Sequence, residues 1–265
     1  MTLSALDVSI LWPALLAGLL VTATHVPLGM QVLARGIVFI DLAIAQIAGC
    51  GVILADRMGF EAEGVAVQVA AATAALAGAL LLTLTERVWP QVQEAVIGVT
   101  FVLGATGGIL LLASNPHGSE HLRDLLVGQI LWAQPARLAW TAAVYAVILA
   151  LWFGRGERLG RAGFYVLFAL AVTGSVQLVG LYLVFATLIV PPLATLAMSR
   201  GRLAAAWGIA AVGYALGLAI STLTDLPSGP VIVWVLVVVG LAWHLLIGRT
   251  SGTGRTPPPE GARGG

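Results

Sequence analysis

Five polar side chains lie inside or at the edge of long apolar runs, and their types could bind or guide a charged solute. They are His25, Asp41, Gln46, Glu94 and Gln177. An ionisable group at the bilayer centre costs about 2.5 to 3.5 kcal/mol on insertion scales, and such groups usually mark substrate or ion pathways. Carboxylate oxygens and imidazole nitrogens are also ligands for metal ions. These five residues are therefore the predicted lining of a substrate path.

Asp41 is the strongest of these candidates, because its side chain is short and charged. At 1.5 Å per residue, it lies about 9 Å along a helix from Arg35, too far for easy snorkelling to the membrane surface. Asp41 is therefore expected to face protein or a water-filled path, as a pore residue or as a structural hydrogen-bond partner. Gln46 lies roughly 140° further around the same helix, so both side chains cannot point in one direction. Whether Gln46 has a functional or a structural role stays open.

His25 precedes Pro27 and Gly29 in the first apolar run. A proline inside a helix removes one backbone hydrogen bond and favours a kink. The imidazole beside this break could ligate a metal, or it could hydrogen-bond a freed carbonyl group.

A polar loop at residues 115–124 offers a second candidate for metal binding. His117 and His121 lie there with Glu120 and Asp124. Imidazole and carboxylate together suit Zn, Mn or Fe. The four-residue spacing brings the two histidines together only in a helix, and a glycine follows His117. A solvated polar loop is the alternative interpretation.

The elements that position these residues are predicted from composition and hydropathy. The chain has 265 residues, of which 59% are hydrophobic and 9% charged, and its mean hydropathy is +0.99. Soluble domains carry about 25% charged residues. Long apolar runs without alternation exclude a β-barrel, which leaves an all-α, polytopic transmembrane helical bundle. About nine spans are predicted, at residues 9–33, 37–55, 64–84, 95–113, 138–153, 163–179, 181–198, 204–223 and 230–247. The sixth and seventh are short and could form a bent re-entrant pair near Gly174 and Gly180.

The distribution of arginine predicts how these spans are oriented. Ten of the 13 arginines fall in alternate connections and the C-terminal tail, and the other face carries most of the acidic residues. Cytoplasmic loops are enriched in Lys and Arg, so the N-terminus is expected outside and the C-terminus inside. Residues 1–247 are predicted to form one membrane domain, in contact with lipid. Residues 248–265, rich in Gly, Pro and Arg, are predicted to be a disordered cytoplasmic tail.

Several function classes are excluded by what the chain lacks. A net charge of +1 gives no basic surface for nucleic acid. The chain contains no lysine, so it has no Walker A motif, which needs a lysine on the nucleotide phosphates. Cys50 is the only cysteine, which excludes a disulfide framework and a CxxC metal site. The chain is predicted not to be an enzyme, and any ATP-driven work must come from another subunit.

Three segments carry a resemblance to a known family. Residues 32–55 read VLARGIVFIDLAIAQIAGCGVILA, residues 93–112 read QEAVIGVTFVLGATGGILLL, and residues 177–200 read QLVGLYLVFATLIVPPLATLAMSR. They resemble, in order, three segments of the zinc, manganese and iron permeases of ABC transporters: R-R-x-S-F-x-G-D-A-L-S-H, an acidic-x-x-I-G helix, and V-G-x-x-L-V-x-A-L-L-I-x-P-A-A-T-A. The resemblance runs from about residue 10 to residue 247. The cobalamin and iron-siderophore permeases share this architecture.

The resemblance implies a permease subunit of an importer for a divalent transition metal in a bacterial inner membrane. It implies a permease homodimer, cytoplasmic ATPase subunits that bind ATP, and a metal-binding protein that docks outside. It implies no permanently bound cofactor, since the metal ion is cargo. A permease for a metal chelate such as haem, siderophore or cobalamin is one alternative, and a secondary transporter is another.

Two departures from the family pattern concern its functional residues. Gln46 stands where the family has His, and Leu42 stands at the expected Asp, with Asp41 one place early. The family's coupling segment, similar to (D/G)-x-E-x-A-R-x-x-G, is shortened here to residues 154–163. Arg155, Glu157, Arg158 and Arg161 are its candidates for contact with the ATPase.

Overall fold

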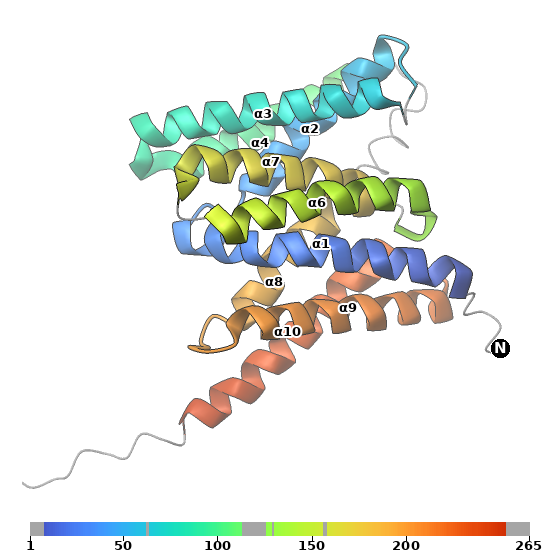
Figure 1. Cartoon of the computed structure of the whole chain (residues 1–265), viewed down its shortest axis with the longest axis vertical. Helices are drawn as coiled ribbons and strands as arrows, with labels where there is room; N and C mark the ends of the chain where they lie inside the picture. Colours follow the sequence, from blue (N-terminus) through green and yellow to red (C-terminus); the bar gives the residue numbers. More distant parts are fainter. Residues whose placement is uncertain (1–7, 62–63, 113–125, 129, 156–157, 253–265) are drawn as a thin grey trace, which may run out of the picture.

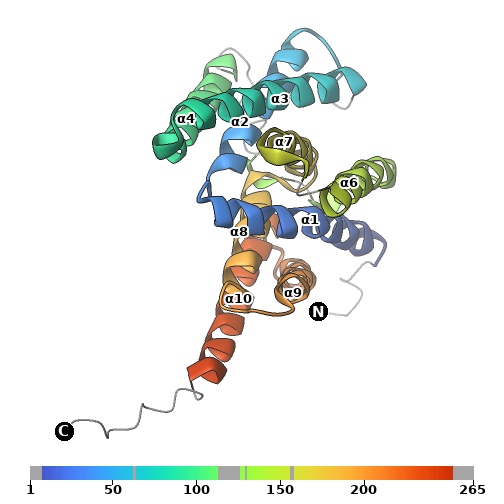
Figure 2. The ribbon, with the colours of Figure 1, turned by 60° about the vertical axis from the view of Figure 1, so that its left-hand side comes forward.

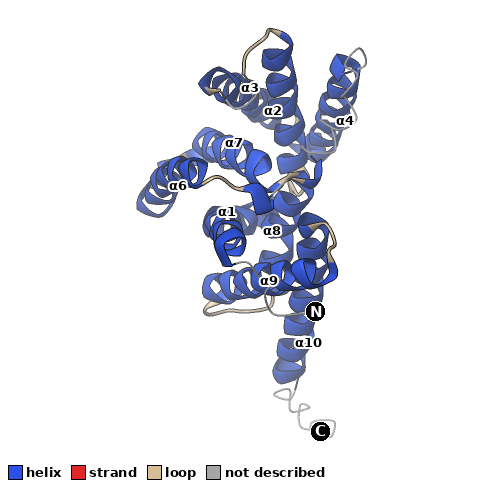
Figure 3. Cartoon of the chain, turned by 90° about the vertical axis from the view of Figure 1, so that its right-hand side faces the viewer, coloured by secondary structure: helices blue, strands red, loops and turns tan. Residues whose placement is uncertain are grey.

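The described part of the chain is mainly helical, with short turns and loops between the helices. The computed structural model describes residues 8–61, 64–112, 126–128, 130–155 and 158–252, and no strand occurs among them (Figure 3). Each predicted span corresponds to an α-helix of this described part. The helices are α1 (Val8–Arg35), α2 (Ile40–Arg57), α3 (Val65–Val88), α4 (Gln93–Leu112), α6 (Pro135–Arg155), α7 (Gly160–Val179), α8 (Leu181–Ala194), α9 (Arg202–Thr224) and α10 (Ser228–Gly252), with short 3-10 turns η2 (Pro90–Val92) and η3 (Ile130–Trp132).

The helices form a bundle whose connections alternate between two ends. In Figure 1, α1, α3, α6, α7 and α9 lie in nearly the same direction, while α2, α8 and α10 run obliquely behind them. The turned view of Figure 2 places α2, α3 and α4 on one side of α1 and α7, and α9 and α10 on the other. The α1–α2, α3–α4, α6–α7 and α8–α9 connections lie at the left end of Figure 1, and the α2–α3 and α9–α10 connections at the right. This alternation is what the predicted chain path requires.

Within the part of the chain that the structure describes, seven helices are long and apolar enough to cross a membrane, by length and composition. They are α1, α3, α4, α6, α7, α9 and α10. The other two predicted spans differ from the expected pattern for separate reasons. The 18 residues of α2 include the charged residues Asp41, Asp56 and Arg57. Helix α8 has 14 residues, about 21 Å at 1.5 Å per residue, which is shorter than the roughly 30 Å hydrocarbon core.

The ends of three helices correct the predicted boundaries. Helix α2 begins at Ile40, after a turn in which Gly36 has φ +70°. Helix α8 ends at Ala194, earlier than expected, just after Pro191 and Pro192. The carbonyl oxygens of both prolines accept from the Thr195 hydroxyl, at 3.1 and 3.2 Å, at this end of the helix. Helix α10 continues to Gly252, so the first residues of the predicted disordered tail are helical. Residues 253–265 lie outside the described part.

Glycines set the closest contacts between helices. A Cβ atom at Gly29 of α1 would lie 1.9 Å from the Leu188 carbonyl oxygen of α8, and one at Gly104 of α4 would lie 2.9 Å from Gln46 Cβ of α2. These backbones can approach only because the side chains are absent. The outer helix faces are apolar in turn: Leu110 and Trp234 are each 74% exposed, as expected for side chains that face lipid.

A second glycine contact holds the turn between α7 and α8. Gly180 has φ +83°, and Gly128 has φ +71°. A Cβ atom at Gly180 would lie 2.4 Å from Gly128 N, and one at Gly128 would lie 2.3 Å from Val179 O. The two backbone segments are therefore in direct contact, and the short helix α8 turns back beside residues 126–128. In place of two short bent segments, the structure has a 20-residue α7 followed by a 14-residue α8.

Candidate functional site

Asp41 lies in the first turn of α2, with Ile40 as the only residue of the helix before it. The predicted depth of about 9 Å along a continuous helix is therefore wrong, because the turn at residues 36–39 separates α1 from α2. The predicted burial is confirmed: Asp41 is 0% exposed. Neither carboxylate oxygen makes a hydrogen bond of ordinary geometry in the described structure, although the backbone amides of Asp41 and Leu42 at the start of α2 lie close to the carboxylate. A buried carboxylate without partners is unfavourable unless a cation or a proton compensates it.

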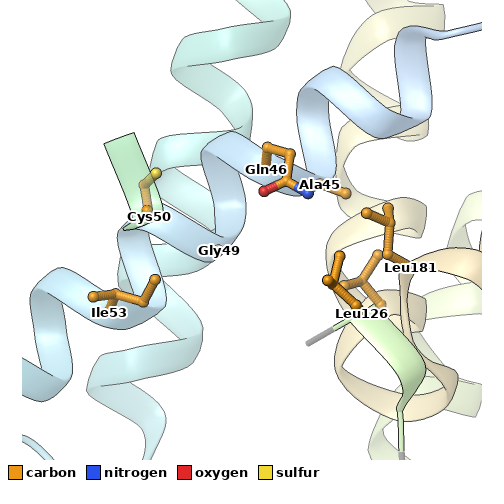
Figure 4. Close-up of a pocket in the computed structure, with 9 residues that line it drawn as sticks. Ala45, Gln46, Gly49, Cys50, Ile53, Leu126 and Leu181 are labelled. Carbon is orange, nitrogen blue, oxygen red and sulfur yellow. The ribbon is translucent and has the colours of Figure 1, made fainter. Parts of the chain in front are cut away.

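Gln46 lies on a different face of α2 and lines a small pocket. The pocket is formed by α2 together with α4, α7, α8 and Leu126. Figure 4 shows Gln46, Gly49 and Cys50 along α2, with Leu126 and Leu181 on the opposite side. Asp41 does not line this pocket. The structure therefore separates the two candidates of α2, as their angular offset predicts.

Cys50 is one helical turn beyond Gln46 and lines the same pocket. Its thiol donates a hydrogen bond to the Gly104 carbonyl oxygen, with Sγ and O 3.2 Å apart. From the sequence, Cys50 served only to exclude a disulfide framework and a CxxC site, and its place beside Gln46 was missed. The signal was its four-residue spacing from Gln46, which places both on one helix face.

His25 is fully buried, and both of its ring nitrogens have protein partners. Nδ1 lies 3.0 Å from the Val21 carbonyl oxygen, and Nε2 lies 3.0 Å from Ser175 Oγ on α7. Because a carbonyl oxygen can only accept, the first contact places the ring proton on Nδ1. Nε2 is then an acceptor for the single proton of the Ser175 hydroxyl, which the Ala171 carbonyl oxygen, 2.8 Å away, can also accept. This geometry matches the hydrogen-bonding interpretation of His25 and leaves no free nitrogen for a metal.

Glu94 and Gln177 are not among the residues that line the pocket. Glu94 is in the first turn of α4, and its Oε1 accepts a hydrogen bond from Phe39 N–H, 3.4 Å away, just before α2. Gln177, near the end of α7, accepts a hydrogen bond from Gln68 of α3. Its Nε2 atom is buried without a partner. The five candidates of the predicted path are thus distributed over several contacts rather than gathered at one site.

The candidates for contact with the ATPase surround the short α6–α7 connection. Arg155 ends α6, and Arg158 lies just before α7. Both are exposed. Arg161, 59% exposed, lies 3.8 Å from Glu86 Oε1 of α3. Glu157 lies outside the described residues, as do His117 and His121 of the polar loop.

The described residues contain no group of three or more His, Cys, Asp or Glu side chains that could hold a metal ion. A closed resident metal site needs about four such ligands.

Comparisons with known proteins decide the family. The model of the ABC 3 transport family matches residues 7–159 and 157–246. The chain belongs to the ABC 3 transport family. It is an ABC-transporter permease, and its membrane-spanning character follows from this family and its apolar helices.

Two solved structures share the fold of this permease. PsaBC from Streptococcus pneumoniae, solved in complex with Fab, has a TM-score of 0.71 and 21% identity, and the alignment covers 88% of this chain and 90% of that chain. An inward-facing conformation of a putative metal-chelate type ABC transporter has a TM-score of 0.61 and 14% identity, with 91% and 85% covered. A comparison with curated protein sequences found no match.

The structure shows where the two residues that depart from the family pattern, Leu42 and Gln46, lie in the fold. Leu42, at the expected Asp, is a partly buried apolar residue that packs against the core. Gln46, at the expected His, lines the pocket. If the correspondence drawn from the resemblance holds, this chain has a polar side chain at one of the two positions, and Asp41 is the carboxylate next to the other.

Proposed function

We propose that this permease is the membrane subunit of an importer that moves a divalent transition metal, Zn, Mn or Fe, into the cytoplasm. The family assignment and the three resembling segments support this function. The chain lacks lysine and hence a Walker A motif, so a separate ATPase subunit drives transport. Two copies of the permease surround the path, and a metal-binding protein delivers the ion from outside a bacterial inner membrane.

The buried carboxylate of Asp41 carries the proposal. Neither oxygen makes a hydrogen bond of ordinary geometry, only the backbone amides of Asp41 and Leu42 lie close to them, and the residue is 0% exposed. A dication near this carboxylate gains an interaction that is several-fold stronger than in water, because the local dielectric constant is low. The negative charge would lower the barrier for a cation that passes α2, and it would do little for a neutral solute.

Gln46 and the outward histidines complete the proposed path. Gln46 presents an amide in the pocket between α2 and α8, where it would contact the ion or its hydration shell. His117 and His121 are proposed to receive the ion at the outward loop. Arg155, Glu157, Arg158 and Arg161 are proposed to contact the ATPase at the α6–α7 connection.

Metal uptake by reconstituted complexes tests the function through Asp41→Asn. This substitution keeps the shape of the side chain and removes its charge. Uptake of Zn, Mn and Fe should fall about tenfold or more, as expected when about 1.4 kcal/mol of barrier lowering is lost. Asp56→Asn is the matched control, because Asp56 lies at the other end of α2 and is partly exposed.

Several outcomes would count against the proposal. Wild-type complexes that transport none of the three ions, but do transport a chelate such as a siderophore, haem or cobalamin, would assign the chain to the chelate permeases. Transport that continues without ATP would indicate a secondary transporter. An Asp41→Asn variant that transports at the wild-type rate would make Asp41 part of the scaffold and move the search to the outward histidines.

A further inference from the structure

The first turns of α7 contact the corner between α3 and α4. Arg161 Nε lies 3.8 Å from Glu86 Oε1 near the end of α3. Tyr165 Oη lies 3.5 Å from Nε2 of Gln93, the first residue of α4. Residues four apart share a helix face, so Arg161 and Tyr165 present one surface of α7 to this corner.

Gln93 is held firmly in the corner. Its Nε2 donates to the Leu82 carbonyl oxygen at 2.9 Å, and its Oε1 accepts from Thr85 Oγ1 at 3.1 Å. Gln93 is 4% exposed, and Tyr165 is 1% exposed. The Glu86 carboxylate also interacts with the Tyr165 hydroxyl. A buried side chain with this many partners moves together with its surroundings.

The next residue, Glu94, contacts a different helix. Its Oε1 accepts from Phe39 N–H, directly before the first residue of α2. Successive residues of a helix point about 100° apart, so the first turn of α4 faces α7 through Gln93 and α2 through Glu94. Helix α4 meets α2 again at Gly104, which lies against Gln46.

These contacts form one continuous path from the start of α7 to the helix that carries Asp41 and Gln46. We propose that Gln93 and Glu94 are positioning residues that transmit a displacement of the start of α7 to α2. This inference rests on the proposed function in one respect, namely that the ATPase acts at the α6–α7 connection. It adds that the movement reaches α2 through the first turn of α4.

Cys50 provides a direct measurement of α2. It is the only cysteine of the chain, it is partly exposed, and it lines the pocket with Gln46. In the complex of the permease with its ATPase, the rate at which a maleimide alkylates Cys50 would be followed with and without ATP. Mass spectrometry of the permease chain separates this label from labels on other subunits. The measurement requires no metal.

The variants are Tyr165→Phe, which removes only the hydroxyl group, and Gln93→Ala, which removes the contacts of the corner. The control is Tyr214→Phe, because the Tyr214 hydroxyl is also buried and lies 2.8 Å from Thr187 Oγ1, between α9 and α8. ATP should change the labelling rate in the wild type and in Tyr214→Phe. The change should be about fivefold smaller in the two link variants, the lower end of typical coupling between sites.

Three results would overturn the inference: no effect of ATP on the wild type, an unreduced effect in Tyr165→Phe, or an equal loss in Tyr214→Phe. Size-exclusion chromatography confirms that each complex is assembled, and Tyr165→Phe decides the test if Gln93→Ala does not fold. Wild-type complexes that respond to ATP but transport no metal would contradict the proposed cargo and leave the link intact. Complexes that transport metal, but in which Tyr165→Phe leaves the ATP effect on labelling unchanged, would contradict the link and leave the proposed cargo intact.

Discussion

His25 and Asp41 are both fully buried, but their polar atoms are in opposite states. The two ring nitrogens of His25 contact Val21 O and Ser175 Oγ, whereas neither oxygen of Asp41 makes a hydrogen bond of ordinary geometry. A satisfied polar group stabilises the core, and an unsatisfied one has a cost that the surrounding structure must offset. The contacts of His25 therefore match its hydrogen-bonding interpretation, and contact of Asp41 with a cation stays a prediction.

Ser175→Ala tests the structural role of the histidine contact. The substitution removes the hydroxyl group and leaves Nε2 of His25 buried without its partner. It should lower the free energy of unfolding by about 1 to 3 kcal/mol, the cost of an unsatisfied buried group. The measurement is thermal or denaturant unfolding of the detergent-solubilised protein.

Transport by the same variant provides the contrast. Metal uptake per folded Ser175→Ala complex should stay near the wild-type rate, unlike that of Asp41→Asn. If Ser175→Ala reduced uptake while its stability was unchanged, the contact would belong to the transport path and the structural role would be rejected.

The helices were predictable as elements, but their ends were not. Hydropathy located every described helix, because a membrane-spanning run is long and strongly apolar. The start of α2 was missed, because the turn at Gly36 depends on backbone conformation and on a contact from Glu94, which is distant in sequence. The depth of Asp41 was wrong for that reason. The residue types of the candidate site were visible in the sequence, whereas their partners depend on which helices pack together.

The turn between α7 and α8 allows a stability test at the level of elements. Gly180→Ala places a Cβ at φ +83° and 2.4 Å from Gly128 N. Both the positive φ and the close contact are unfavourable. The strained backbone of a non-glycine residue costs about 1 to 3 kcal/mol of folding free energy by itself. The variant should therefore unfold at a lower temperature than the wild type.

Gly98→Ala is the control for this turn, because nothing lies within 4 Å of a Cβ at Gly98 in α4. Alanine there should be neutral or stabilise by about 0.4 to 1 kcal/mol. Equal melting temperatures for Gly180→Ala and the wild type would show that the contact between Gly128 and Gly180 does not hold in the membrane protein.

At the scale of the whole molecule, the bundle has two chemically different ends. The α1–α2, α3–α4, α6–α7 and α8–α9 connections lie together at one end (Figure 1), and their flanking residues include Arg35, Arg87, Arg155 and Arg202. Arg202 Nη2 donates to the Pro192 carbonyl oxygen at 3.2 Å. This arginine therefore also provides a hydrogen-bond donor for a carbonyl group near the end of α8. Arginine is enriched on the cytoplasmic side of membrane proteins, which predicts that this end faces the ATPase.

Reporter fusions test that orientation. A reporter fused after Arg200, between α8 and α9, should be active only in the cytoplasm, and one inserted near Glu61, between α2 and α3, only outside. The two connections lie at opposite ends of the bundle (Figure 1), so the pair forms its own control. Both reporters on one side would contradict the chain path, because α3, α4, α6, α7 and α8 could not then connect them as drawn. A consistent inversion would keep the path but place the α6–α7 connection outside. No ATPase could then reach it, and the proposed coupling through Gln93 and Glu94 would fail with it.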